Sequence, residues 1–493
     1  MADRPIWNPT EHGVLVLLPV LGLAAVGLAS IHATETRTGS LLGPNTTKQC
    51  VFLLIGAGVM VATLWVSYQR IGRMAYSLFA LTLALLSLLL VDKWFLDLPL
   101  IENRQGAWRW IDFGGIQIQP SELMKVVFIL ALARYLQFRR NYRRLSGLMG
   151  PFVLTLVPMF LILPEPDLGT VVLMMPVLLV MLFAAGARYR HFMLMLLLAI
   201  CALPLVWAGM HGYQRRRVAA VVMQSPAVRD KVMGLVAKLG PQPELENELT
   251  GGALSEKSRR KLAAASIAVS ANATVQVEAP GRRWTLTDSE QTWTIRRVTR
   301  TIDEQKVSHF HVYQAPSRPW TWLGTPQQAR DWELTDGYQL KHAMVALSSG
   351  GWFGQRDETS LAILQSEYIP HRHNDFIFAV VGYRWGFVGA LFVIGCYAVI
   401  AVGGVEIASL TNEPFGRLLA VGVVTLISAQ ALINIGISLG LMPTTGMTLP
   451  FVSYGGSSLL VNFIAVGLLI NIAQRRPMVI GHEPFSFTDD DEE

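Results

Sequence analysis

The chain has 493 residues, of which 52% are hydrophobic and 15% are charged, and its 41 basic and 35 acidic residues give a formal net charge of +6. A soluble globular chain carries about 25% charged residues. Because the apolar residues fall in long runs and there are only three cysteines, the composition excludes an ordinary soluble protein, a disordered chain and a disulfide-stapled one. We interpret the basic excess as orienting the chain in a membrane, and we expect no nucleic-acid partner.

About ten apolar runs are long enough to cross a membrane, for which a helix needs roughly 20 residues. The first run is too long, and too poor in small residues at a cleavage site, to be a removed signal peptide, so we expect it to be retained. The pattern predicts an all-α polytopic membrane protein with about ten transmembrane helices. In chain order the runs cover residues 13–32, 50–68, 75–93, 120–138, 147–163, 168–187, 191–210, 375–402, 416–440 and 448–472.

Lysine and arginine in the short loops predict the orientation, because these residues favour the cytoplasmic side. If the N-terminus is cytoplasmic, the basic residues of three short loops and of the C-terminal end all fall on the cytoplasmic side of the membrane. An even number of helices returns the C-terminus there, so we expect both termini in the cytoplasm. The residues are Arg70, Arg73, Arg134, Arg139, Arg140, Arg143, Arg144, Arg188, Arg190, Arg475 and Arg476.

The runs divide the chain into four parts. Residues 1–212 hold helices 1–7, and residues 213–336 form an extracytoplasmic loop. Residues 337–476 hold a re-entry segment and helices 8–10, and residues 477–493 form a cytoplasmic acidic tail that is expected to be solvated.

The extracytoplasmic loop carries an inserted domain over about residues 225–330. Its first part is typical of short helices, and its second part alternates apolar and polar residues as strands do. We therefore expect a small α+β or β-rich insertion between helices 7 and 8. A long disordered loop is the alternative, which the alternation and the tryptophans disfavour. The strand-like segments are residues 274–277, 284–287 and 293–295.

Charged residues inside apolar runs are costly and point to function. At the start of the fourth run, Glu122 and Lys125 are three residues apart and so share a helix face. Arg109, Trp110 and Ser121 are close to them in the sequence and join them as candidate binding residues. The structural alternatives are an internal ion pair that locks two helices together and an interfacial aromatic belt for the tryptophan.

Two further acids are expected at the outer ends of helices. Asp167 lies in a short outer turn, where it could simply cap the sixth helix. Asp375 opens the eighth run, where a helix N-terminus and nearby Arg372 favour a carboxylate, and an N-cap is again the alternative. His371 and His373 are two residues apart, a spacing that disfavours a metal site on one helix face.

The tenth run is interrupted between Pro443 and Ser458 by prolines, glycines and hydroxyl side chains. Broken backbone at membrane depth is tolerated only where it is buried in protein or lines a wet cavity. Its N–H and hydroxyl donors could bind an anion, or its small residues could form a tight helix-packing seam. The candidate binding residues are Ser453, Gly455, Gly456, Ser457 and Ser458.

No Walker loop, Rossmann fingerprint or HExxH motif is present, which disfavours nucleotide-driven chemistry. The chain instead resembles the SEDS family (shape, elongation, division and sporulation), whose members include RodA and FtsW. The resemblance covers nearly all of the chain except roughly residues 225–330, and the sequence Thr444–Met447 favours the RodA branch. The segments that carry it are residues 108–125, 166–170, 337–354, 373–378 and 434–458.

The resemblance implies a ten-helix enzyme of the bacterial cytoplasmic membrane that polymerises lipid II into glycan strands during cell elongation. It also implies a class B penicillin-binding protein, which cross-links the strands, as partner. The family's invariant acid falls on Asp375, its cavity Glu and Lys on Glu122 and Lys125, its Pro-Asp-Leu-Gly acid on Asp167, and its tryptophan on Trp110. The chain departs from the family pattern at His371, Asn374, Tyr383 and Arg384.

The implied reaction joins a sugar 4-hydroxyl to an anomeric carbon while a lipid pyrophosphate leaves. A sugar hydroxyl is a weak nucleophile, so we expect the Asp375 carboxylate to act as general base. Lys125, Arg109 or a divalent cation (Mg²⁺ or Mn²⁺) would stabilise the leaving pyrophosphate. Glu122 and Asp375 are the candidate cation ligands, and we expect no organic cofactor.

Two other classes of function fit the same residues. A flippase for lipid-linked precursors suits broken helices and intramembrane charges, although the acids cluster at the outer face rather than at the midplane. A non-catalytic scaffold that activates a transpeptidase suits the large insertion. Membrane lipids are partners in all three cases.

Overall fold

In the computed structural model, the chain divides into two compact units. The first comprises Met1–Pro204 together with His342–Glu493, and the second comprises Leu205–Lys341. The structure describes residues 11–35, 43–95, 101–104, 107–112, 117–138, 145–165, 167–193, 212–225, 228, 236–239, 243–264, 269–270, 272–279, 283–288, 291–302, 305–314, 337–355 and 373–475.

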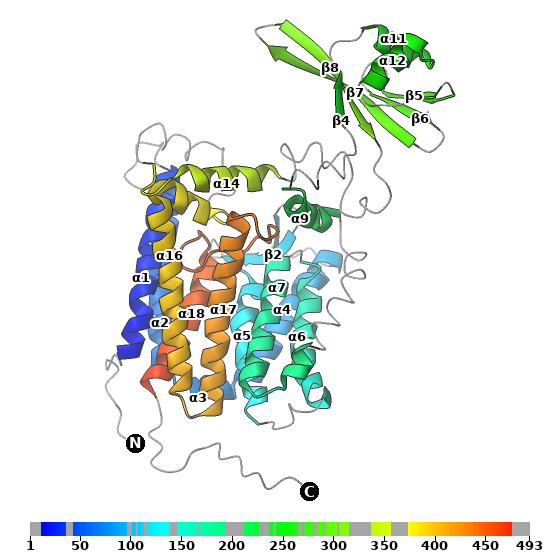
Figure 1. Cartoon of the computed structure of the whole chain (residues 1–493). Helices are drawn as coiled ribbons and strands as arrows, with labels where there is room; N and C mark the ends of the chain where they lie inside the picture. Colours follow the sequence, from blue (N-terminus) through cyan, green and yellow to red (C-terminus); the bar gives the residue numbers. More distant parts are fainter. Residues whose placement is uncertain are drawn as a thin grey trace. The chain divides into compact units, whose positions relative to one another are not determined.

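The first unit is a bundle of helices (Figure 1). Within the described part of the chain, nine of the predicted apolar runs are helical, and six of these helices are long and apolar enough to span a membrane. The run predicted at 191–210 lies outside the described residues from residue 194 onward. The nine helices are α1 (Glu11–Glu35), α2 (Pro44–Trp65), α4 (Ala75–Phe95), α5 (Pro120–Leu136), α6 (Met149–Ile162), α7 (Leu168–Ala184), α16 (Ile377–Ser409), α17 (Pro414–Ser438) and α18 (Gly456–Gln474).

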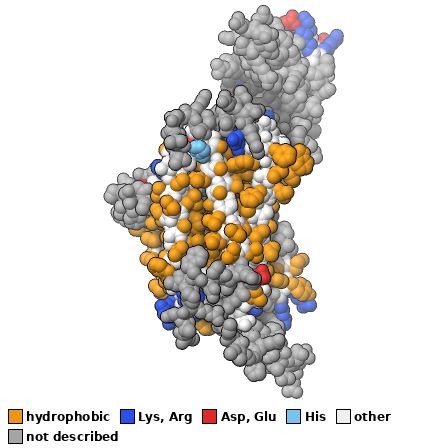
Figure 2. All heavy atoms as spheres, turned by 90° about the vertical axis from the view of Figure 1, so that its left-hand side faces the viewer, with side chains coloured by type: hydrophobic (Ala, Val, Ile, Leu, Met, Phe, Trp, Pro, Cys, Tyr) orange, Lys and Arg blue, Asp and Glu red, His pale blue; other side chains and the backbone are white. Residues whose placement is uncertain are grey.

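The helices are apolar on the outside of the bundle as well as inside it. α17 and α18 are largely buried, whereas Leu18 of α1 and Val402 of α16 are 62% and 66% exposed. On the side of the helical unit that faces the viewer in Figure 2, hydrophobic side chains cover the surface, and basic side chains lie mainly toward the two ends of the unit. Such surfaces are stable in lipid, so the predicted class of polytopic helical membrane protein is confirmed.

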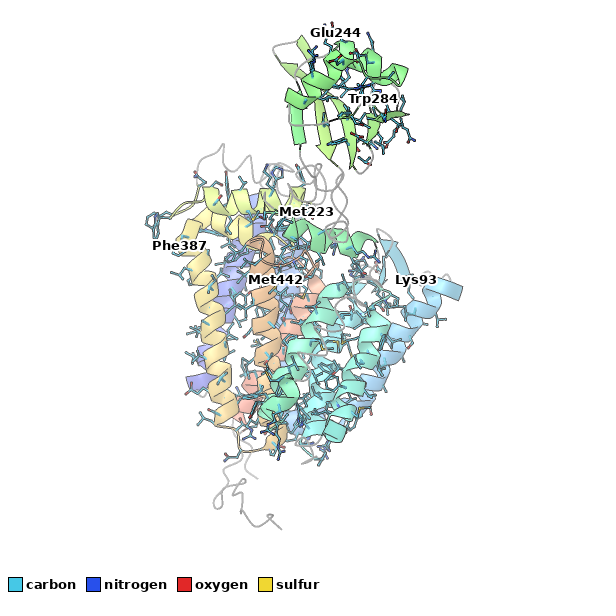
Figure 3. The ribbon with its side chains drawn as sticks, turned by 45° about the vertical axis from the view of Figure 1, so that its right-hand side comes forward. Lys93, Met223, Glu244, Trp284, Phe387 and Met442 are labelled. Atoms are coloured by element: carbon cyan, nitrogen blue, oxygen red, sulfur yellow. The ribbon has the colours of Figure 1, made fainter. Side chains whose placement is uncertain are left out.

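α16 is broken near its start. Gly386 has φ 66° and ψ −161°, a backbone conformation that glycine tolerates and other residues rarely adopt. The loop that follows α14 (Tyr338–Ser349) fills the break, where the Phe387 N–H donates to the Gly351 carbonyl at 2.8 Å. A short buried helix over residues 377–385 therefore precedes the longer piece, from which Phe387 points outward (Figure 3).

The chain between α17 and α18, residues 439–455, is irregular and is called the broken segment below. Pro450 has no N–H to donate, and Phe451 adopts the left-handed region with φ 65°. The helix predicted from residue 448 consequently begins eight residues later, at Gly456. The expectation of an interrupted run is confirmed, but the predicted start of the last helix is wrong.

A small antiparallel sheet that the sequence analysis did not predict lies between α4 and α5 in the chain. Its strand order is β1-β2-β3. Ile101 and Ile111 of the sheet pack against Leu89 of α4, which holds β2 against the helical bundle. The strands are β1 (Ile101–Arg104), β2 (Ala107–Asp112) and β3 (Gln117–Ile118).

The second unit contains the inserted domain, an antiparallel sheet of strand order β4-β8-β7-β6-β5. Trp284, Trp293 and Phe310 of the sheet pack with Leu245 and Leu262 of two helices in one hydrophobic core, in which Figure 3 labels Trp284. A β-rich insertion is therefore confirmed, although β4 falls in a part predicted as helical. The elements are β4 (Val236–Leu239), α11 (Pro243–Gly251), α12 (Glu256–Ala264), β5 (Thr274–Ala279), β6 (Arg283–Asp288), β7 (Gln291–Ile302) and β8 (Gln305–Gln314).

Candidate active site

The start of α5 carries a nearly buried ion pair. Lys125 Nζ lies 2.6 Å from Glu122 Oε2, and the two side chains are 3% and 12% exposed. The predicted pairing on one helix face is confirmed, but both residues belong to α5, so the pair does not lock two helices together. An ammonium group at this depth requires a negative partner, and the pair keeps a positive charge available inside an apolar helix.

Asp167 joins the starts of α5 and α7. It is the N-cap of α7 and accepts from the Thr170 N–H at 3.2 Å, which confirms the capping interpretation. Its carboxylate also accepts hydrogen bonds from the Thr170 hydroxyl at 2.9 Å, the Ser121 hydroxyl at 2.8 Å and the Gln119 amide at 3.0 Å. Four donors around a buried carboxylate hold it in one orientation.

Glu165 lies in the same turn and was not among the predicted site residues. It is 1% exposed, and neither of its carboxylate oxygens has a hydrogen-bond partner among the described residues. Burial, assisted by the nearby Asp167 charge, raises the pKa of Glu165 to about 9 against the opposing effect of Arg109 and Lys93. The side chain therefore holds a proton at neutral pH.

Replacing Glu165 with Gln is expected to raise the melting temperature of the detergent-solubilised protein by several degrees near pH 8. The pKa of Glu165 is higher in the folded chain than its usual 4.5, so folding favours proton uptake. Its contribution to stability is complete below pH 4.5 and is lost as the pH rises toward about 9. Glu165→Gln removes this dependence on pH. If the melting temperatures of both proteins changed with pH in the same way between 4.5 and about 9, a protonated Glu165 would be contradicted.

Two basic side chains act on the same turn. Lys93 at the end of α4 donates to the Pro164 carbonyl at 2.8 Å, and the Arg109 charge is close enough to lower the pKa of Glu165. Arg109 and Trp110 are half-buried on β2, with the guanidinium carbon 5.8 Å from the Trp110 ring centre, within the range of a cation–π contact. Two of the predicted site residues, Arg109 and Asp167, therefore both influence the pKa of Glu165.

Asp375 lies in the partly exposed turn that precedes α16. The cap position of α16 is occupied by Phe376 and has no side-chain hydrogen bond, so the N-cap alternative for Asp375 is wrong. The Asp375 carbonyl accepts from Asn434 Nδ2 of α17 at 3.0 Å, and the preceding Asn374 carbonyl accepts from the Ser453 hydroxyl at 2.7 Å. Asp375 is therefore held where α16, α17 and the broken segment meet.

The hydroxyl groups of Ser453, Ser457 and Ser458, the candidate serines in and beside the broken segment, have partners inside the protein. Besides the bond to Asn374, Ser453 Oγ accepts from the Leu449 N–H at 2.7 Å. Ser457 Oγ donates to the Gln117 carbonyl at 2.6 Å, and the hydroxyl groups of Ser458 and Thr448 are 2.6 Å apart. These bonds connect the broken segment and the start of α18 with β3, and the binding roles stay predictions.

Of the two candidate glycines, Gly456 packs closely. A side chain at Gly456 would meet the Phe52 ring of α2 at 2.9 Å, whereas Gly455 has more room. Gly456 therefore fits the alternative of a tight helix-packing seam. An anion-binding role for Gly455 stays a prediction.

The broken segment links the two groups of candidate residues. Asn434 Nδ2, besides its bond to Asp375, donates to the Met447 carbonyl at 2.6 Å, and the Met447 side chain packs against Gly169, next to the Asp167 cap. One group contains Asp375 and Ser453. The other contains Arg109, Trp110, Ser121, Glu122, Lys125, Asp167, Ser457 and Ser458, which lie at β2 and at the starts of α5, α7 and α18.

The side chains proposed as cation ligands fit a divalent ion poorly. Among the described residues, no group of three or more His, Cys, Asp or Glu side chains is arranged to hold a metal. Glu122 already pairs with Lys125 at 2.6 Å, so a cation on Glu122 would compete with the ammonium group. The cation stays a prediction, and no step below depends on it.

Glu165 and Asn434 were missed for different reasons. Glu165 is flanked by two prolines in the turn that also carries Asp167, and an acid confined in this way next to a helix start is a signal that could have been used. Asn434 is a single amide in a long apolar run, where it looks like an ordinary interhelical hydrogen bond. Nothing in the sequence connects it with Asp375.

Taken together, the fold and the site define a polytopic membrane protein in which buried charged residues lie near the starts of α5 and α7 and irregular backbone interrupts the apolar spans. The chain belongs to the FtsW, RodA and SpoVE family of cell cycle proteins, whose family model matches residues 11–231 and 301–477.

Relatives of both main branches match along almost the whole chain. The peptidoglycan glycosyltransferase RodA of Treponema pallidum is 28% identical over 473 residues, covering 95% of this chain and 98% of the relative. The probable peptidoglycan glycosyltransferase FtsW of Pseudomonas fluorescens is 28% identical over 493 residues, covering 98% and 91%. Because the chain is 28% identical to both the RodA and the FtsW relative, its assignment to the RodA branch stays a prediction.

Two solved structures share the fold. A chain from a peptidoglycan synthase complex that coordinates polymerization and crosslinking matches with a TM-score of 0.62 and 22% identity, over 94% of this chain and 98% of that one. The crystal structure of the rod shape determining protein RodA of Thermus thermophilus matches with a TM-score of 0.55 and 22% identity, over 96% and 99%.

Proposed function

We propose that the chain is a peptidoglycan glycosyltransferase that polymerises lipid II into glycan strands at the outer face of the bacterial cytoplasmic membrane. The observation that carries the proposal is the placement of Asp375, a carboxylate on a turn held by hydrogen bonds from two other elements. The names of the relatives from Treponema and Pseudomonas support the same chemistry.

The proposed reaction needs a base and a positive charge. Asp375 accepts the proton of the attacking sugar 4-hydroxyl as the new bond forms to the anomeric carbon. The bond to the lipid pyrophosphate breaks, and the ammonium group of Lys125 and the guanidinium of Arg109 stabilise the negative charge on the leaving group. Glu122 holds Lys125 in place through their ion pair at 2.6 Å, and the apolar faces of the spans accommodate the polyprenyl chains.

A transpeptidase of the class B penicillin-binding proteins is the proposed partner. The support is the solved peptidoglycan synthase complex, which coordinates polymerization with crosslinking and contains a chain of this fold. A role in elongation rather than division follows only from the resemblance of residues 444–447 to the RodA branch. We propose both termini in the cytoplasm on the basis of the arginine distribution.

Polymerisation of labelled lipid II by the purified chain tests the function. We expect glycan ladders from the chain alone, or from the chain with a transpeptidase whose own polymerase activity has been excluded. A chain that is folded, forms no ladder under either condition and moves lipid II across vesicle bilayers would be a flippase, the candidate favoured by the broken backbone at Gly386. A chain inactive in both assays that still stimulates the transpeptidase would be a scaffold.

A further inference from the structure

Three consecutive backbone carbonyls of the turn that carries Asp375 accept hydrogen bonds from other parts of the chain. The carbonyl of His373 accepts from the Tyr454 N–H at 2.8 Å. The carbonyl of Asn374 accepts from Ser453 Oγ at 2.7 Å, and that of Asp375 accepts from Asn434 Nδ2 at 3.0 Å. Every donor comes from α17 or the broken segment, so the geometry of the turn is set from outside α16.

Intrahelical bonds cannot replace these contacts. The first carbonyl of this region that α16 itself uses is that of Phe376, which accepts from the Ala379 N–H at 3.0 Å. The three preceding carbonyls lie before the helix and depend on external donors. Removing a donor would leave a carbonyl without a partner and allow the turn to move.

Both side-chain donors are themselves fixed. Asn434 is fully buried, and its Nδ2 also donates to the Met447 carbonyl at 2.6 Å. Ser453 is 3% exposed, and its hydroxyl also accepts from the Leu449 N–H at 2.7 Å. Each residue therefore ties the Asp375 turn to the broken segment rather than merely touching it.

We infer that Asn434 and Ser453 are positioning residues that hold Asp375 in the geometry needed for proton abstraction. The inference rests on the proposed function, in which Asp375 is the general base. A base must lie within hydrogen-bond reach of the proton that it removes, and a displacement of about 1 Å can lower a rate by about 100-fold. The hydroxyl of Ser453 thereby acts on Asp375 through the backbone rather than on the substrate.

Loss of positioning differs from loss of binding in its kinetic signature. Both donors bond to backbone carbonyls of the Asp375 turn, so we expect their removal to lower the turnover rate and to leave the affinity for lipid II unchanged. We expect Asn434→Leu and Ser453→Ala to lower kcat by about 10- to 100-fold with KM within about twofold of the wild-type value. Ser453→Thr keeps the hydroxyl group and should recover most of the activity.

Gln430 provides a matched control. It lies one turn before Asn434 on α17, and its side-chain amide donates to the Thr448 carbonyl of the broken segment at 2.9 Å. It is buried like Asn434, yet its bonds go to Thr448 and not to residues 373–375. Gln430→Leu therefore disturbs the broken segment without releasing the Asp375 turn, and we expect its kcat to fall by less than about threefold.

The experiment measures initial rates of lipid II polymerisation for these variants beside Asp375→Ala, with melting temperatures in detergent to establish folding. Normal kcat in folded Asn434→Leu and Ser453→Ala, with Asp375→Ala inactive, would overturn the inference and leave the proposed function standing. A raised KM at normal kcat, or an equal loss in Gln430→Leu, would also overturn it. If Asp375→Ala polymerises normally, the role of Asp375 as general base and the inference fail together, while the proposed polymerase activity stands; a folded wild-type chain that forms no ladder would instead contradict the proposed function. If Asn434→Leu does not fold, the contrast between Ser453→Ala and Ser453→Thr decides.

Discussion

Asp375→Ala is expected to lower lipid II polymerisation by about 10²- to 10⁴-fold, the range typical of losing a general base. The side chain that would receive the proton disappears, and Ala offers no acceptor in its place. The hydrogen bonds that hold this turn go to backbone carbonyls, including the one from Asn434 to residue 375, so the variant retains them. Folding and membrane insertion should therefore be preserved, which size-exclusion profiles and melting curves can check.

Two further variants show whether the loss of activity in Asp375→Ala comes from the missing base. Asp375→Asn keeps the shape of the side chain and removes its basicity, so it should be as inactive as Asp375→Ala. Asp288→Ala in the inserted domain removes an aspartate that accepts from the N–H and hydroxyl of Ser270, and it reports the effect of losing a carboxylate elsewhere. Asp375→Asn with wild-type activity would exclude base catalysis by this residue, because an amide cannot accept the proton.

Hydrophobic run length was enough to predict the spans, because a membrane helix is defined by about 20 apolar residues whatever they pack against. It could not show the break at Gly386, since a glycine in an apolar run looks the same in a continuous helix. The sheet β1–β3 was missed for a different reason: residues 107–112, which form the six-residue strand β2, were interpreted only through their charged and aromatic side chains as candidate binding residues.

The candidate site was predictable where charge made residues conspicuous. Glu122, Lys125 and Asp167 stood out because ionisable groups are rare in apolar surroundings, and the structure places all three near helix starts. The partners of Asp375 could not be predicted, because Asn434 and Ser453 are about 60 and 80 residues away in the sequence and act on its backbone. Long-range hydrogen bonds to carbonyls leave no local signature of side-chain type.

Lys125→Met is expected to lower polymerisation by about 10²- to 10³-fold, the loss typical of removing one group that stabilises developing negative charge. The same change leaves Glu122, which is 12% exposed and paired at 2.6 Å in the wild type, without its partner. Removing one member of a buried pair typically costs about 3–5 kcal/mol, so the melting temperature should fall as well. Activity and stability are thus lost together in the single variant, and a second change is needed to separate them.

The double variant Glu122→Gln/Lys125→Met separates the two effects. Replacing both charges with neutral side chains of similar size removes the unpaired carboxylate, and such replacements are often neutral or stabilising. We therefore expect the melting temperature to return to near the wild-type value while polymerisation stays as low as in Lys125→Met. The comparison distinguishes a positive charge used in the reaction from an ion pair that serves only to hold α5 in place. Recovery of activity together with stability would assign the pair a purely structural role, because the ammonium group would then be dispensable for the leaving pyrophosphate.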